Sequence, residues 1–485
     1  MKRAFDAFAF AAATVFALAA AAVAGGNSHF FRDDFAGFFL ARSQPFWRIL
    51  ATPIDVHFVP LHRLVNQLVY SLAPLDFDVA LAVLVAFHAL AVATLYATLR
   101  ALKDAPSNTV LVFLYATNVY LGVLFLWWTA GLHRLPYVAL ALVTLYHYLA
   151  YRRTARARSV VVAWLCFVAA LGFYTKAALI PAVMLGMEIC LLRETAPGQL
   201  RKNGRVIAAF VATSALYVLL ARSLIASQFS QLHLEPGFLL EFELRSFAVL
   251  AAGVFGDVSR PWVAPANFIF MGAWLAFAAY TIARAPWNAV VWAVAITLVA
   301  LNFGVVAVSQ RTVRYGLSLA ATPRYYFELM FIVVLFVAMA LHNLPARSPI
   351  AALARHPGRR LAMTLVASGM LLALAVVSFA HFESLLETRR YRRNRDAKVF
   401  VDNLRADLDA LRRRPQGEFA FVDGLVPSYL TGKSADHVRR YSKFLGIFGF
   451  EARFDPAAST LYAITEQGEV RPVLRQRTRQ PARGD

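Results

Sequence analysis

The chain has 485 residues, of which 59% are hydrophobic and only 16% are charged, and its formal net charge at pH 7 is +21. Because soluble domains average roughly 25% charged residues, this composition excludes an ordinary soluble globular protein. The positive charge does not predict a nucleic-acid partner, since many Lys and Arg residues lie in loops between apolar runs, where membrane topology places them.

The apolar runs predict helices that span a membrane. A run of about 18 or more residues can cross a hydrocarbon core of about 30 Å, and roughly eleven such runs recur along this chain. The expected fold class is therefore an all-α polytopic membrane protein. Its spans are expected near residues 4–24, 78–100, 108–127, 135–151, 159–173, 177–192, 205–224, 266–284, 288–308, 324–342 and 361–380.

The first span also has features of a secretory signal peptide. Lys2 and Arg3 precede it, and the sequence Ala-Val-Ala lies near its end. Asp6 is unusual in a signal peptide and the run reaches about 20 residues, so we expect an uncleaved first helix.

Basic residues assign the two sides of the membrane. If Lys2 and Arg3 are cytoplasmic, then three later basic clusters, within residues 152–158, 193–205 and 347–360, also fall on the cytoplasmic side. An odd number of spans then places the C-terminus outside. We expect a multi-pass protein of a bacterial inner membrane with an extracytoplasmic C-terminus.

The first external loop, residues 25–77, is long enough to hold structure of its own. Its sequence HFVPLHRLVNQLVYSLAPL has apolar residues at helical spacing and a polar opposite face. This pattern predicts one or two helices lying in the membrane interface. The short apolar stretch at 241–256 is expected to form either a further interfacial helix or a half-span.

The tail, residues 381–485, differs in composition from the rest. Its first part is charged and is expected to form a helix with Val399, Phe400, Leu404, Leu408 and Leu411 on one face. The sequence EFAFVDGLV predicts a strand, and STLYAITEQGEVRPVL predicts a hairpin that turns near Gly468. We therefore expect a transmembrane domain over residues 1–380 and a small extracytoplasmic α/β domain over residues 381–485.

Two adjacent aspartates, Asp33 and Asp34, follow the first span in the sequence FFRDDFAGFF. They are either a hydrated helix end or part of a functional site. Charged residues recur in the other external loops, and ionisable groups near membrane depth are costly, so they usually face a cavity or a partner. These residues are Asp55, His57, His62, Arg63, His133, Arg134, Lys176, Arg311, Arg314 and Arg324.

This set of charges suits an anionic ligand. Carboxylates can act as a base, and Arg or Lys side chains can bind a phosphate or pyrophosphate. Each residue also has a structural alternative. Lys176 is placed to snorkel from a helix end, and Arg134 is placed to anchor a helix at the interface.

The order and sidedness of these motifs resemble the GT-C superfamily of polyprenyl-phosphate-dependent glycosyltransferases, which includes protein O-mannosyltransferases and lipid A aminoarabinose transferases. The resemblance covers roughly residues 1–380, and the tail matches no part of the family pattern. The sequences WWTAGLHRLPY and TPRYYFEL are similar to later family features. In FYTKAALIPAVML the Glu that often follows the family lysine is absent, because Ala177 follows Lys176. The first-loop residues that carry the resemblance are Asp33, Asp34, His57, Pro60, Leu61, Arg63 and Leu64.

The resemblance implies an inverting glycosyltransferase that acts on the external face. Asp33 or Asp34 would be the base, and His57 and Arg63 would support the first loop. The donor phosphate would bind Arg134, Lys176 and Arg324. The partners implied are a polyprenyl-phosphate-linked sugar donor, a lipid, glycan or protein acceptor, and membrane lipids.

Three alternatives stay open at this point. Some members of the superfamily bind a divalent cation at the acidic site and others do not, so a metal is one open possibility, and no other cofactor is indicated. A transporter or flippase for an anionic lipid would use the same cations, although many transporters contain internal repeats, and the sequence shows none. A non-catalytic envelope scaffold would not need the acidic pair.

Overall fold

A computed structural model describes residues 2–55, 57–225, 235–253, 265–345, 357–414, 419–431, 438–458 and 460–473. The chain divides into two compact units. The first unit comprises Met1–Gly26, Leu50–Val65 and Asp78–Thr388, and the second comprises Asn27–Ile49, Asn66–Phe77 and Arg389–Asp485. Two segments of the first external loop therefore group with the tail.

Every predicted span falls on helix. In chain order these helices are α1 (Lys2–Asn27), α5 (Phe77–Leu102), α6 (Ser107–Ala116) with α7 (Val119–Phe125), α8 (Trp128–Thr154), α9 (Ala157–Phe173), α10 (Ile180–Cys190), α11 (Pro197–Leu224), α13 (Pro265–Arg284), α14 (Asn288–Ala307), α16 (Phe327–His342) and α18 (Pro357–Leu386). Among the described residues, 6 helical segments are long and apolar enough to cross a membrane on their own, within α1, α5, α6–α7, α11, α14 and α18. The polytopic helical class is confirmed, and the count of about eleven crossings stays a prediction.

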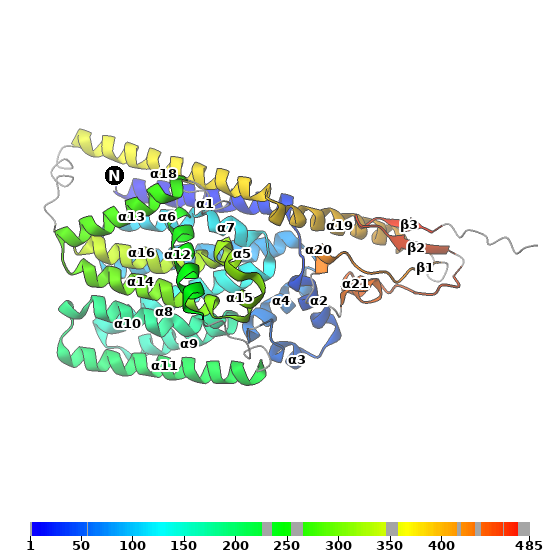
Figure 1. The fold of residues 1–485 in the computed structure, drawn as a ribbon, viewed down its shortest axis with the longest axis horizontal. Helices are drawn as coiled ribbons and strands as arrows, with labels where there is room; N and C mark the ends of the chain where they lie inside the picture. The colour runs from blue at the N-terminus through cyan, green and yellow to red at the C-terminus, as the bar shows by residue number, and fades with distance from the viewer. Residues whose placement is uncertain are drawn as a thin grey trace, which may run out of the picture. The chain divides into compact units, whose positions relative to one another are not determined.

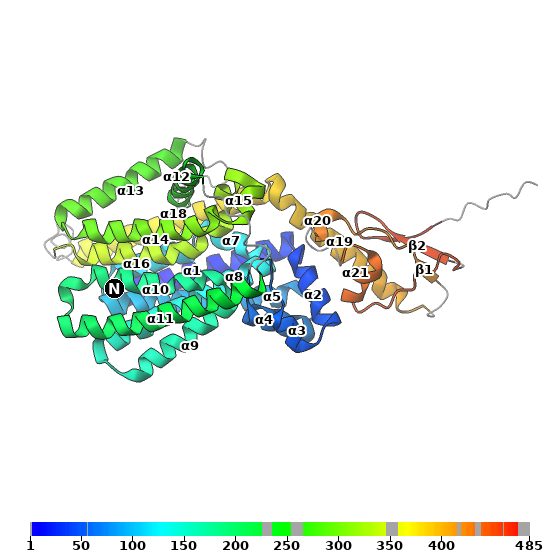
Figure 2. The same ribbon diagram turned by 60° about the horizontal axis from the view of Figure 1, so that its bottom comes forward.

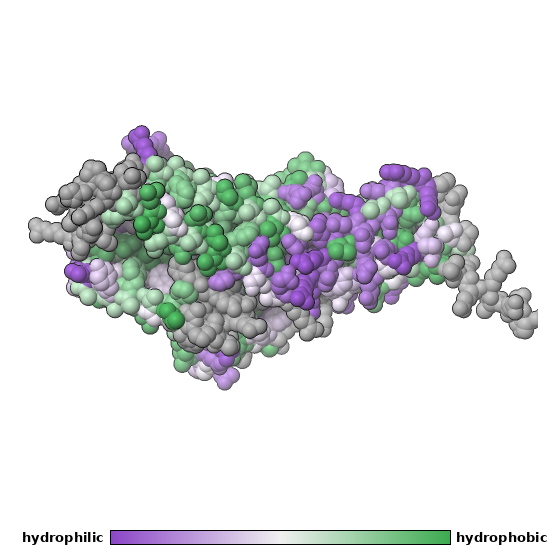
Figure 3. All heavy atoms as spheres, turned by 90° about the horizontal axis from the view of Figure 1, so that it is seen from above, coloured by the Kyte–Doolittle hydropathy of each residue, from purple (hydrophilic) through white to green (hydrophobic). Residues whose placement is uncertain are grey.

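The helices of the first unit differ in what surrounds them. Almost all of α16 is buried, and it lies beside α14 in both ribbon views (Figures 1 and 2). In contrast, α11 and α18 present large apolar side chains outward: Leu216 is 70% exposed and Leu365 is 63% exposed. Figure 3 shows apolar surface over α18. A helix that is apolar on its outer face as well as its inner face is suited to lipid contact.

Residues 241–252 of the stretch predicted at 241–256 lie on α12 (Pro236–Ala252), which runs across the long helices instead of along them (Figure 1), and residues 254–256 lie outside the described residues. The C-terminal end of α12 contacts the chain at the break between α6 and α7, at Thr117 and Asn118. Asn118 caps α7, because its side chain accepts a hydrogen bond from the Tyr120 amide at 2.9 Å. The hydroxyl of Tyr120 donates to the Val249 carbonyl at 2.6 Å. The expected interfacial helix is therefore favoured over the half-span.

Parts of the first external loop and the tail build the second unit. The loop contributes α2 (Asp33–Ser43), most of α3 (Phe46–Ala51) and the C-terminal half of α4 (Pro60–Leu72). The tail contributes α19 (Arg389–Leu411), α20 (Ser428–Thr431), α21 (Tyr441–Ile447) and three strands. Strand β1 (Phe419–Phe421) pairs in parallel with β2 (Thr460–Ile464), and β2 pairs antiparallel with β3 (Val470–Pro472). The predicted strand and hairpin are confirmed.

The predicted apolar face of α19 is correct except at one position. Phe400, Leu404 and Leu408 are at most 1% exposed, but Val399 is 46% exposed. The buried face includes Val401 at 0% instead. At about 100° per residue, Val401 lies only about 60° around the helix from Leu404, at the centre of the buried face, whereas Val399 lies about 140° from it.

The hairpin turn depends on Gly468, and we expect Gly468→Ala to destabilise the second unit. Gly468 has φ of +85°, and a Cβ there would collide with the backbone of Phe400. The left-handed backbone alone costs an alanine about 1–2 kcal/mol, and the collision adds to this. Limited proteolysis of the tail in the full-length protein should show faster cleavage than in the wild type.

Gly446→Ala is the matched control, since a Cβ at this helical position meets nothing within 4 Å. It should leave cleavage unchanged or slow it. Equal cleavage of the two variants would contradict the role given to Gly468.

Candidate functional site

Tyr325 lies at the centre of a cluster of cations in the first unit. It belongs to the 3-10 turn η5 (Pro323–Tyr325), which leads into α16, and its side chain is buried. Arg134 Cζ lies 5.3 Å from the ring centroid, Lys176 Nζ lies 5.7 Å from it and Arg324 Cζ lies 5.1 Å from it. The three cations predicted to bind a phosphate therefore surround one aromatic ring. They come from α8, from the 3-10 helix η1 (Thr175–Leu179) and from η5.

The hydroxyl of Tyr325 receives two arginine donors. Arg311, on α15 (Gln310–Tyr315), donates to it through Nη1 at 3.0 Å, and Arg324 donates through Nη2 at 3.3 Å. Burial by itself disfavours charge on a phenol oxygen, but the guanidinium donors of Arg311 and Arg324 act in the opposite direction. The surroundings of this oxygen therefore favour negative charge.

Glu328, in the first turn of α16, pairs with two of the cations. Its Oε2 lies 3.2 Å from Arg134 Nε, and its Oε1 accepts from Lys176 Nζ. Glu328 is 0% exposed, and both partners are at most 5% exposed. Lys176 also donates to Asn302 Oδ1 on α14 at 2.9 Å. This pairing joins α8, η1, α14 and α16 beneath Tyr325, and it reduces the charge that Arg134 and Lys176 present to a ligand.

Arg311 and Arg324 are the more accessible cations of the cluster. Arg311 pairs with Asp55, whose side chain is 48% exposed. Arg324 is half-buried, and its guanidinium lies over the Trp127 ring at 4.6 Å. Because solvent screens an exposed carboxylate, Asp55 neutralises the charge of Arg311 less than the buried Glu328 neutralises its partners. These two arginines are therefore better placed than Arg134 and Lys176 to bind an anion directly.

His57 and Arg63 hold the part of the first loop that belongs to the first unit. The backbones of Ile54 and His57 bond to each other at 2.8 and 2.9 Å, with Asp55 at φ of +51° between them. Arg63 donates to the Thr52 carbonyl at 3.0 Å and to the Pro53 carbonyl at 2.8 Å. These bonds support the turn that presents Asp55.

Three histidine rings pack next to this turn. The ring centroids of His57 and His133 are 5.4 Å apart, and those of His62 and His133 are 4.2 Å apart. His57 Nδ1 also pairs with Thr175 Oγ1 at 2.8 Å. Burial, assisted by nearby cations such as Arg311, holds the pKa of His57 well below 6.5. His57 is therefore neutral near pH 7 and adds no charge to the cluster.

Asp33 and Asp34 belong to the second unit and open helix α2. Asp34 is 0% exposed, and its Oδ2 accepts a hydrogen bond from the Phe31 amide at 3.0 Å. Asp33 is half-buried. The residue before them, Arg32, has φ of +53°, an uncommon conformation that turns the chain into the helix. The two aspartates are thus not equivalent, because the buried Asp34 carboxylate accepts a hydrogen bond from the backbone.

The prediction from sequence missed Glu328 as a member of the cluster. It named Arg311 among the external charges but not among the residues expected to bind the donor phosphate. The sequence does contain a clue to Glu328, which follows TPRYY at the start of an apolar run. An ionisable residue in such a place requires a partner. The side chain of Arg314 lies outside the described part of the chain. Over the described residues, no group of three or more His, Cys, Asp or Glu side chains is arranged to hold a metal ion.

Comparison with known proteins finds likeness among solved structures. No protein-family model matches the sequence, and no curated protein matches it. A crystal structure of ArnT from Cupriavidus metallidurans in the apo state superposes with a TM-score of 0.48 and 14% sequence identity, over 93% of this chain and 91% of that chain. At this score and identity the likeness carries no argument about activity, so a functional assignment depends on the side chains described above.

Proposed function

We propose that the protein is a membrane glycosyltransferase of the GT-C type, which moves a sugar from a polyprenyl-phosphate donor to an acceptor on the external face. The observation that carries this proposal is the convergence of Arg134, Lys176, Arg311 and Arg324 on Tyr325. The two carboxylates paired with these cations are Glu328 and Asp55. The described pairs thus set four cations against two carboxylates, which suits an anionic ligand.

Arg311 and Arg324 have the geometry that a phosphate oxygen requires. Both already direct an N–H donor at one oxygen, the Tyr325 hydroxyl. Guanidinium groups bind phosphate oxygens through paired donors, and fixed donors stabilise charge that develops on a leaving group. Arg134 and Lys176, held by Glu328, would orient η5 and add to the positive potential.

The chemistry follows from this assignment. A hydroxyl or amine of the acceptor attacks the anomeric carbon from the side opposite the phosphate, and the bond between that carbon and the phosphate oxygen breaks. The anomeric configuration is inverted, and the electron pair leaves on the phosphate. The proton of the acceptor passes to a carboxylate of the first loop.

Asp33 is the proposed base. Asp33 belongs to the motif that resembles the family, and its side chain is half-buried whereas that of Asp34 is buried. The buried Asp34 is proposed to hold the helix start through Phe31. An extracytoplasmic C-terminus and a contribution of the tail to acceptor binding are parts of the same proposal.

A transfer assay tests the function. Purified full-length protein in nanodiscs is supplied with radiolabelled polyprenyl-phosphate sugars and a panel of lipid, glycan and peptide acceptors. We expect label to move to an acceptor and free polyprenyl phosphate to form in equal amount. Movement of intact donor across proteoliposomes without transfer would instead establish a transporter.

Replacing Arg324 by Gln is expected to lower kcat/KM for the donor by about 10²–10³-fold, the effect of removing one donor to a developing oxyanion. Arg324→Lys should recover part of the loss, because it keeps the charge but lacks the planar fork. The measurement is initial transfer rate against donor concentration.

Arg100→Gln is the control, since Arg100 is an exposed arginine at the end of α5. If Arg324→Gln transfers sugar as fast as Arg100→Gln does, the phosphate site is not at Tyr325.

A further inference from the structure

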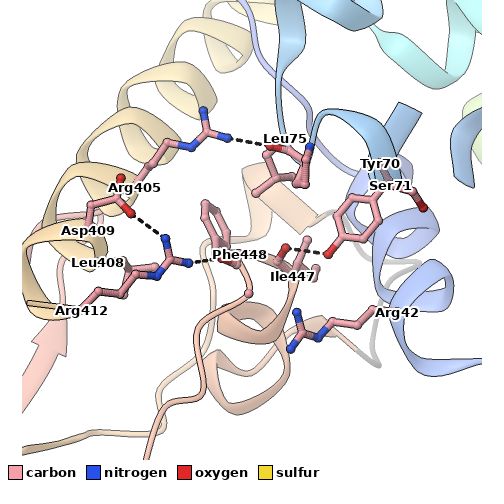
Figure 4. Close-up of a pocket in the computed structure, with 12 residues that line it drawn as sticks. Arg42, Tyr70, Ser71, Leu75, Arg405, Leu408, Asp409, Arg412, Ile447 and Phe448 are labelled. Atoms are coloured by element: carbon pink, nitrogen blue, oxygen red, sulfur yellow. Dashed lines mark hydrogen bonds and ion pairs between the residues drawn. The ribbon is translucent and has the colours of Figure 1, made fainter. Parts of the chain in front are cut away.

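We propose that the second unit contains a separate anion-binding pocket that takes a phosphate group carried on a sugar. The pocket has a volume of about 600 Å³, within the range of small-molecule sites. All of its lining residues belong to the second unit. They come from α2, from the end of α4, from α19 and from the turn that follows α21 (Figure 4).

The lining of the pocket is positively charged. Arg42, Arg405 and Arg412 line it together with one carboxylate, Asp409. Asp409 accepts a hydrogen bond from Arg412 Nη1 at 2.7 Å. Three guanidinium groups thus face one carboxylate, and this lining favours an anionic ligand.

Neutral groups hold two of the arginines in place. Arg405 Nη2 donates to the Pro74 carbonyl at 2.8 Å, and Arg412 Nη2 donates to the Phe448 carbonyl at 2.6 Å. A backbone carbonyl fixes the direction of a guanidinium without cancelling its charge. Each of these side chains has further N–H groups, because a guanidinium carries five donors.

Two of the arginines border the same turn at Gly449. A Cβ at this position would lie 3.7 Å from Arg42 Nη1 and 3.7 Å from Arg412 Nη2. Figure 4 shows the two side chains reaching this turn from opposite sides. An anion bound at this turn would be attracted by both guanidinium groups at once. This convergence is the feature that points to a ligand.

The other walls suit a sugar. Tyr70 and Phe448 supply aromatic surface, and the Tyr70 hydroxyl donates to the Ile447 carbonyl at 2.8 Å, which joins α4 to the tail. Arginine forks match the geometry of a phosphate. The shared ligand chemistry is a phosphorylated sugar, whether it is the headgroup of a glycolipid or a soluble sugar phosphate. The role of this ligand as acceptor rests on the proposed glycosyltransferase function.

Binding measurements on the full-length protein in nanodiscs test the pocket without any need for turnover. The soluble probe is glucose 6-phosphate with glucose as its neutral counterpart. The lipid probe is a monophosphorylated glycolipid with its dephosphorylated form. The variants are Arg42→Gln, Arg412→Gln and their combination. Arg413→Gln is the control, because Arg413 is exposed and does not line the pocket.

We expect each pocket variant to weaken binding of at least one phosphorylated probe by roughly tenfold or more, as the loss of a charge-assisted hydrogen bond predicts. Arg413→Gln should bind like the wild type, and thermal unfolding of all variants should be similar. Binding of the lipid probe alone would identify a headgroup site, and binding of both probes would identify a general sugar-phosphate site.

Three results would overturn the pocket: no binding of either phosphorylated probe, equal binding of the neutral probes, or undiminished binding by the double variant. Transfer can fail while this binding persists, and this binding can fail while transfer persists. Failure of the pocket is therefore distinguishable from failure of the enzyme assignment. Arg324→Gln, which alters the first unit only, should leave binding here intact.

Discussion

Asp33→Asn should lower the rate of sugar transfer by about 10²–10⁴-fold, which is the contribution of a general base. An amide cannot take the proton of the acceptor, so the chemical step loses its base while the donor still binds. Asp33 is half-buried in the first turn of α2. The loss of one charge there should change the free energy of unfolding by no more than about 1 kcal/mol.

Asp34→Asn separates the two aspartates. Its carboxylate is buried and accepts from the Phe31 amide, and a hydrogen bond to a charged group contributes about 1.5–3 kcal/mol. We expect a lower unfolding temperature and a transfer rate, per folded molecule, near that of the wild type. The measurements are single-turnover transfer and thermal unfolding of the same samples.

The reversed pattern would assign the base to Asp34. Full activity in both single variants and in the double variant would remove a first-loop aspartate from the mechanism.

Glu328→Gln is expected to destabilise the first unit strongly and to abolish transfer. Glu328 is 0% exposed and pairs with Arg134 and Lys176, which are both buried. Removing one partner of a buried ion pair typically costs about 3–5 kcal/mol, because the remaining charge is left without compensation. The unfolding temperature in detergent should fall by on the order of 5–10 °C.

A second substitution tests whether unpaired charge is the cause. Adding Lys176→Gln to Glu328→Gln removes one of the two stranded cations, so the double variant should be more stable than Glu328→Gln alone. Glu383→Gln, at an exposed position of α18, is the control and should unfold like the wild type. If Glu328→Gln unfolds at the same temperature as Glu383→Gln, the buried pairing does not stabilise the fold.

The helices were predictable from sequence because a lipid bilayer permits few backbone conformations. A long apolar segment in lipid must pair its backbone groups internally, so each apolar run becomes a helix. The break between α6 and α7 was not predicted. It depends on Asn118, which caps α7 and also bonds to Gly253 at 3.3 Å, far along the chain.

The candidate site was predictable only in part. Arg134, Lys176 and Arg324 were identified because charges beside apolar runs are rare and need partners. Their common neighbour Tyr325 was identified by no such rule, because a tyrosine near a membrane surface is ordinary. Glu328 is also a charged residue beside an apolar run. It was not considered, because a carboxylate does not bind a phosphate.

The sequence by itself determined most of the helices, which charges flank the apolar runs, and where the hairpin turns. These features depend on neighbouring residues and on the solvent that each segment requires. Only the tertiary structure decided which charges meet. Lys176 and Glu328 are 152 residues apart in sequence, and Lys176 and Asn302 are 126 apart. Such pairs are set by how the helices pack, because no local pattern records which helix ends become neighbours.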